Sequence, residues 1–125
     1  MINEEKNRVP LDLSYLREMS GDSIEFMIEM LDMFQQQTPI YLSELEQALA
    51  QKDWPKVSSC AHKMKPTFAY VGRDDAKDHL QMMELNAREQ KDVELLPVAF
   101  AELNDFIQVL NKQLDATKLD LEKQL

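Results

Sequence analysis

Apolar and polar side chains alternate along this chain with the period of an α-helix. The pattern is clearest between residues 57 and 71, where the apolar positions are Val57, Cys60, Met64, Phe68 and Val71. Spacings of three and four residues match the 3.6 residues of a helical turn, so these side chains fall on one face. We therefore predict a helix over this stretch, closed by Gly72, with one buried side.

The same period recurs in the rest of the chain. It predicts further helices over residues 10–20, 24–34, 39–51, 74–87 and 96–114. Asp22 or Ser23 is suited to cap the helix over residues 24–34. Asp53 is suited to cap the helix that contains residues 57–71. Pro39 leaves two possibilities open, because residues 39–51 are either a new helix or the kinked second half of the preceding one.

The segment from Phe26 to Phe34 is apolar at nearly every other position. Such a stripe is too wide for a helix with one buried side. Its inner part is expected to join the core, and the remainder meets either a neighbouring helix or a partner. We favour core over docking.

Composition supports a helical domain. The 125 residues include only two glycines and five prolines, and good helix formers dominate. This length suits one domain spanning residues 1–125. We predict an all-α fold, an antiparallel four-helix bundle with one or two accessory N-terminal helices, a frayed lead-in at 1–9 and a projecting helix end at 116–125.

Charge and hydropathy exclude several classes of partner. The net charge of -9 disfavours binding to nucleic acid, which is a polyanion. No apolar run is long enough to span a membrane, and the polar N-terminal residues lack a signal-peptide core. Cys60, the single cysteine, falls on the buried stripe. We expect a cytoplasmic monomer with no nucleic-acid or membrane partner.

His62 lies nearly opposite the apolar stripe of its helix, so its imidazole should face outward. Lys65, three residues on, shares that face. The neighbours one and two turns away are mostly small: Ser58, Ser59, Pro66 and Ala69. A neutral imidazole is a competent nucleophile near neutral pH, and a lysine can neutralise phosphate oxygens. Helix geometry alone favours the simpler reading, an exposed histidine without a role.

Five cations gather within or beside this helix: Lys56, Lys63, Lys65, Arg73 and Lys77. A basic cluster on an acidic protein suits an acidic docking partner. The plainer interpretation is a solvated face that carries lysines. The sequence leaves both open.

The spacing around His62 resembles the histidine-containing phosphotransfer (HPt) domain. The family signature is His-x-Leu/Met-Lys-Gly, with small residues after it and a closing glycine. Here His62, Lys65 and Gly72 occupy those places, together with Met64, Thr67 and Ala69. The similarity extends back through residues 11–16 and 26–34 and forward to Glu84. One departure is Pro66, which stands where the family usually has glycine.

The resemblance implies a phosphorelay intermediate. His62 would accept a phosphoryl group from an aspartyl phosphate on a response-regulator receiver domain and pass it to another receiver. Lys65 would stabilise the phosphate charge, and the docking and geometry positions would be Ser58, Ser59, Lys63, Pro66, Ala69 and Gly72. Glu84 would have a structural role. The implied partners are receiver domains and a hybrid histidine kinase.

The resemblance also implies what the chain lacks. We expect a phosphohistidine carrier without ATP-dependent kinase activity of its own and without a cofactor, because the receiver brings the divalent metal. The main alternative is a helical-bundle binding module that docks receivers and transfers nothing. A metal site at His62 and His79 fails, since they lie on different predicted helices with no further ligand nearby. His79 is expected to face solvent and is assigned no role.

Overall fold

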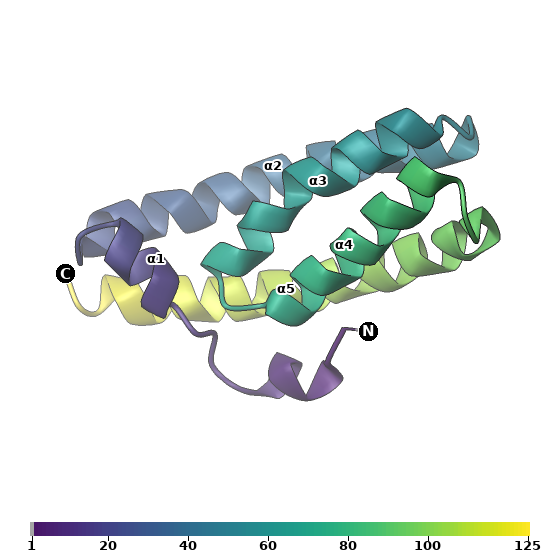
Figure 1. Ribbon diagram of the computed structural model, residues 1–125. Helices are drawn as coiled ribbons and strands as arrows, with labels where there is room; N and C mark the ends of the chain where they lie inside the picture. The colour runs from purple at the N-terminus through teal and green to yellow at the C-terminus, as the bar shows by residue number, and fades with distance from the viewer. Residues whose placement is uncertain (1) are drawn as a thin grey trace.

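The computed structural model describes residues 2–125, which form an elongated helical bundle (Figure 1). Its α-helices are α1 (Ser14–Met19), α2 (Ile24–Ala50), α3 (Trp54–Tyr70), α4 (Asp74–Glu89) and α5 (Leu96–Glu122), and its 3-10 helices are η1 (Glu4–Arg8) and η2 (Val93–Leu95). Helix α2 packs on α3, α3 on α4, α4 on α5 and α5 on α2. This closed ring of neighbours is the predicted antiparallel four-helix bundle, with η1 and α1 as accessory elements.

Polar side chains and a proline mark where the long helices begin. Ser23 Oγ accepts a hydrogen bond from the Phe26 amide at 3.2 Å, and Asp53 Oδ1 accepts one from the Lys56 amide at 3.3 Å. Each satisfies an amide that has no partner within its helix. Helix α5 begins at Leu96 and holds Pro97 in its first turn, where a missing amide costs nothing.

Helix α2 continues through Pro39 without a break. Of the two possibilities left open by the sequence, a new helix at residue 39 is therefore wrong. Pro39 has no amide to donate to the carbonyl one turn back. Just before it, the Thr38 hydroxyl donates to the Phe34 carbonyl at 2.5 Å, an additional bond beside the position where the proline removes one.

The core lies between the four long helices. All five residues of the apolar stripe on α3 are buried, none more than 2% exposed. From α5, Phe106 packs edge-on against Phe68 of α3, with ring centres 5.8 Å apart. Of the two phenylalanines of α5, Phe106 is in the core, whereas Phe100 is only partly buried.

The apolar segment of α2 divides between core and surface. Met27, Leu31 and Phe34 are buried, whereas Phe26 and Met33 are 43% and 44% exposed. Core burial therefore accounts for the inner side of this stripe, as favoured from the sequence. The outer side remains on the surface of α2.

The N-terminal arm, residues 2–13, differs from the expected frayed lead-in. Residues Glu4–Arg8 form η1, and hydrogen bonds tie the arm to α4 and α5. Helix α1 begins at Ser14 rather than at Pro10. The sequence signal was weak here because the arm is held by contacts with residues far away in the chain.

The C-terminal end was predicted to project from the bundle. Helix α5 does continue to Glu122, but Leu121 is only 2% exposed, so this end is packed. Leu119 and Leu125 are exposed. None of the helices within residues 2–125 is long and apolar enough to cross a membrane.

Candidate functional site

His62 lies in the middle of α3, on the side that faces away from the core. Its side chain is 69% exposed, as the helical period predicted. The buried stripe of α3 fixes the rotation of the helix about its axis, and this rotation turns His62 outward. Ser59, Pro66 and Ala69 share its side of α3, and we call these four residues the His62 face.

Glu84 of α4 holds one nitrogen of the imidazole. Nδ1 of His62 lies 3.2 Å from Oε2 and 3.3 Å from Oε1 of Glu84. An ionised carboxylate can only accept hydrogen bonds, so Nδ1 carries the proton. The lone pair of the neutral ring is then on Nε2, for which no hydrogen-bond partner is found within residues 2–125.

The Glu84 carboxylate is also bound by two cations. Lys65 Nζ lies 2.6 Å from Oε1, and Arg88, one turn further along α4, forms an ion pair with Oε2. Lys65 additionally donates to Gln81 Oε1 at 2.5 Å. Glu84 and Gln81 therefore fix the position of Lys65 beside the imidazole, contacts that the sequence analysis did not predict.

These contacts keep the carboxylate ionised despite its burial. The Glu84 side chain is only 4% exposed, and burial alone would raise its pKa. Hydrogen bonds and charge from Lys65 and His62 outweigh this effect and hold the pKa of Glu84 below its ordinary value. The site thus has an ionised carboxylate, paired with two cations, directly behind the exposed histidine.

Helix periodicity contained a signal for two of these partners. Gln81, Glu84 and Arg88 are spaced by three and four residues, which places them on one face of α4. We identified Glu84 from the sequence but missed Gln81 and Arg88. Projecting α4 onto a helical wheel around Glu84 would have found both.

The residues predicted to surround His62 separate into exposed and buried groups. Ser59, Lys63 and Pro66 are exposed and Ala69 is half-buried. Ser58, in contrast, is buried at 9% exposure and does not belong to the surface. It is therefore a packing residue.

The predicted basic cluster is smaller than the sequence indicated. Lys56, Lys63 and Lys77 are exposed, but Lys65 is held by Glu84 and Arg73 is only 2% exposed. Lys63 is paired with α2, where its Nζ lies 3.4 Å from Glu44. This helix therefore does not present a continuous basic surface.

Helix α3 runs through Pro66 to Tyr70. Proline has no amide hydrogen, so it cannot donate to the carbonyl of His62 one turn back. The exposed ring of Pro66 lies on the His62 face, directly beyond the imidazole. The glycine usual in the family would have no side chain there.

Gly72 has a structural role in the turn after α3. Its φ is +75°, and a Cβ at this position would lie 2.4 Å from the Asp12 carbonyl oxygen. Any other residue would strain the backbone and also collide with the N-terminal arm. The glycine predicted to close the helix thus allows the arm to approach α3.

The sequence analysis predicted that His79 faces solvent, and this prediction is wrong. It is 2% exposed, and its Nε2 lies 2.8 Å from the Ala99 carbonyl of α5. Its role is to join α4 to α5 inside the bundle. Over residues 2–125, no group of three His, Cys, Asp or Glu side chains could hold a metal ion.

Comparison with known proteins gives two matches. The model of the family described as "Hpt domain" matches residues 29–118. The crystal structure of the HPT domain from a sensor hybrid histidine kinase of Shewanella is similar over 90% of this chain and 94% of that one. The two share 26% sequence identity, with a TM-score of 0.67. No curated protein matches the sequence.

Proposed function

This chain belongs to the Hpt domain family, and we propose that His62 is its phosphoacceptor in a phosphorelay. His62 takes a phosphoryl group from an aspartyl phosphate on a response-regulator receiver domain and passes it to a second receiver. The protein is a monomeric cytoplasmic carrier that meets receivers and a hybrid histidine kinase. It has no ATP-dependent kinase activity.

One observation carries this proposal: an exposed imidazole is held at Nδ1 by a buried carboxylate. His62 is 69% exposed and Glu84 is 4% exposed. The contact selects the tautomer and directs the Nε2 lone pair outward. A nucleophile that must enter the active site of another protein needs both properties.

The transfer step balances without a further reagent. Nε2 of His62 attacks the phosphorus, the N–P bond forms, and the P–O bond to the receiver's aspartate breaks. The electron pair of that bond stays on the aspartate as a carboxylate. The ring keeps its Nδ1 proton and becomes positively charged, and the negative charge of Glu84 stabilises it. Reversing these steps delivers the group to the next receiver.

Lys65 supports the same step by charge. Its ammonium group, 2.6 Å from Glu84 Oε1, is fixed beside the imidazole and attracts the incoming phosphate oxygens. Phosphoryl transfer depends chiefly on in-line geometry and neutralised charge. We propose that the receiver supplies the acidic pocket and the divalent metal.

The test is phosphorylation of the purified chain. Incubation with phosphoramidate, and separately with phosphorylated receivers of the source organism, should produce an acid-labile, hydroxylamine-sensitive phosphate on His62. The His62→Gln variant should acquire none and keep its fold, because the side chain is exposed and the glutamine amide can still donate a hydrogen bond to Glu84. Receivers that bind without labelling the chain would support the non-transferring module instead.

The docking side can be tested at Pro66. On the proposed face, Pro66→Gly should accept phosphate normally because the surface stays open. Pro66→Glu should block transfer from a receiver, since it places a long charged side chain next to the imidazole. Equal transfer rates for Pro66→Glu and the unaltered protein would show that receivers approach from another side.

A further inference from the structure

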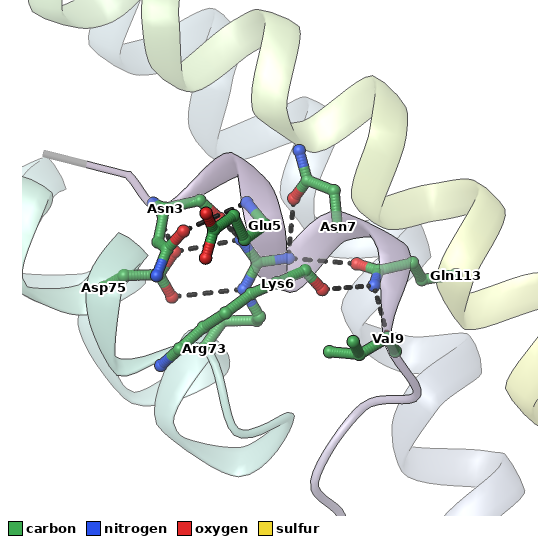
Figure 2. Close-up of polar contacts among 8 residues, drawn as sticks. All are labelled: Asn3, Glu5, Lys6, Asn7, Val9, Arg73, Asp75 and Gln113. Carbon is green, nitrogen blue, oxygen red and sulfur yellow. Dashed lines mark hydrogen bonds and ion pairs between the residues drawn. The ribbon is translucent and has the colours of Figure 1, made fainter.

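Arg73, in the turn between α3 and α4, is a buried arginine with every N–H group satisfied (Figure 2). It holds Asp75 through Nε at 3.1 Å and Nη2 at 2.9 Å. Nη1 donates to Asn7 at 2.8 Å and to Gln113 at 3.0 Å. Nη2 also donates to the Asn3 carbonyl at 3.1 Å. Two of these partners belong to the N-terminal arm.

The other partners of Arg73 bind the arm as well (Figure 2). Asp75 Oδ2 accepts a hydrogen bond from the Asn3 amide at 2.8 Å. Gln113 of α5 donates to the Lys6 carbonyl at 2.9 Å and to the Val9 carbonyl at 3.1 Å. We call this set of contacts the Arg73 clamp. It fixes the arm on the first turn of α4 and on the later part of α5.

The arm and the guanidinium depend on one another. Arg73 is only 2% exposed, and its Cζ lies 4.6 Å from the centre of the Phe106 ring. Without the arm, the guanidinium of Arg73 would lose its hydrogen bonds to the Asn3 and Asn7 oxygens. Unsatisfied donors on a buried charged group lower the stability of the folded protein. The clamp therefore favours a single docked position of the arm.

The arm leads directly from the clamp to α1. Asp12 lies against Gly72, and its Oδ1 accepts hydrogen bonds from the amide of Ser14 at 3.0 Å and from its hydroxyl at 2.6 Å. Tyr15, the next residue, packs against Tyr70 of α3, with the two rings tilted by 33° and their centres 5.3 Å apart. Helix α1 is therefore held at two places, by the arm that precedes it and by Leu16, which is fully buried in the core.

Helix α1 extends the surface that surrounds His62. Tyr70 lies eight residues after His62, about 12 Å along the helix axis. Tyr15 is 48% exposed, and a hollow beside it is lined by Ala69 of the His62 face and by Lys6 and Asp12 of the arm. A stable protein interface buries about 800 Å² of each partner, so a receiver centred on His62 would reach α1.

We propose that Arg73 is a positioning residue for receiver docking. The Arg73 clamp holds the arm, the arm holds α1, and α1 presents Tyr15 to the receiver at the edge of the His62 face. This inference rests on the proposed function. It assigns Arg73 to recognition of the receiver, whereas the phosphorylation step depends on His62, Lys65 and Glu84.

The experiment separates docking from chemistry with two phosphodonors. Phosphoramidate is too small to need α1, so it should label His62 at the same rate in Arg73→Lys and in the unaltered protein. With a phosphorylated receiver, Arg73→Lys should raise the half-saturating concentration about thirtyfold, the size of a hot-spot contact, and leave the saturating rate unchanged. Arg8→Ala, an exposed arm residue outside the clamp, is the matched control.

A second variant tests the route through α1. Tyr15→Ala should raise the half-saturating concentration by a similar factor. The double variant should bind the receiver no more weakly than the weaker-binding of the two single variants, because both substitutions remove the same contact between Tyr15 and the receiver. Additive effects would overturn the proposal, as would an unchanged half-saturating concentration in folded Arg73→Lys. If Arg73→Lys does not fold, Asn7→Ala replaces it with the same expectation. Failure of both donors to label the unaltered protein would instead reject the proposed function.

Discussion

Glu84 and His62 are in contact but have opposite exposures. The carboxylate is 4% exposed, while the imidazole that it binds at 3.2 Å is 69% exposed. The charge is therefore shielded from water and ions, and the nucleophile is open to another protein. An exposed carboxylate in the same place would be screened and would order the ring less.

Replacing Glu84 by glutamine should slow the transfer without preventing it. The amide oxygen can still accept the Nδ1 proton, but the negative charge behind the ring is lost. A hydrogen bond to a charged group is worth about 1 kcal/mol more than one to a neutral group, so the rate of labelling by phosphoramidate should fall about five- to tenfold. An undiminished rate would show that the charge of Glu84 does not assist the step.

Lys65→Ala should lower both the transfer rate and the stability. The lysine side chain is 17% exposed and is bound to Glu84, so its removal takes a partner from a buried carboxylate and should cost about 1–3 kcal/mol. Lys63→Ala is the matched control, because its pair with Glu44 is exposed and worth less than about 1 kcal/mol. Urea unfolding and transfer rates measured together distinguish the two lysines. Equal effects would contradict the site as described.

Gly72→Ala should destabilise the protein far more than Gly21→Ala. Both glycines have positive φ, +75° and +62°, but only at Gly72 would a Cβ collide, at 2.4 Å from the Asp12 carbonyl oxygen. Left-handed backbone alone costs about 1–2 kcal/mol, which is what Gly21→Ala should show. The added collision should bring Gly72→Ala to at least about 3 kcal/mol. Similar thermal midpoints for both variants would mean that the arm yields easily.

The stability lost in Asp75→Asn should depend on pH. Burial alone would raise the pKa of Asp75, but hydrogen bonds from Arg73 and Asn3 hold it below the ordinary value of 3.8. A carboxyl group whose pKa is lowered in the folded state stabilises the protein at pH values above its ordinary pKa. This contribution is lost as the pH falls toward the pKa of the folded state. The variant should be about 3 kcal/mol less stable at pH 7.

The difference between Asp75→Asn and the unaltered protein should be constant from about pH 5 to pH 8 and should shrink below about pH 4. Urea unfolding at a series of pH values measures it. Asp74→Asn, at an exposed neighbouring carboxylate, provides the control and should show little change. A gap for Asp75→Asn that persists undiminished in acid would show that the charge of Asp75 is not what stabilises the clamp.

Local patterns predicted the bundle and the central histidine. The stripe from Val57 to Val71 determined which side of α3 is buried, and this side in turn placed His62 outside. Glu84 followed from the family resemblance, and Asp53 from the preference for carboxylates at helix starts. Apart from Glu84, each of these depends on residues close together in the chain.

The errors involved residues whose environment is made by distant segments. Arg73 and His79 were expected at the surface because charged and polar residues usually lie there. Arg73 is instead enclosed by the arm and by α5, and His79 by the α5 carbonyl at Ala99. No helical period indicates such partners, which are 20 to 70 residues away.

The bond between the Gln113 side chain and the Lys6 carbonyl spans 107 residues. Closing so long a loop costs more chain entropy than closing the short turn between α3 and α4. We therefore expect the arm to dock late in folding and to detach first when the protein opens. In native-state hydrogen exchange, the amides of η1 should lose protection in local openings, well before those of α3 exchange through global unfolding.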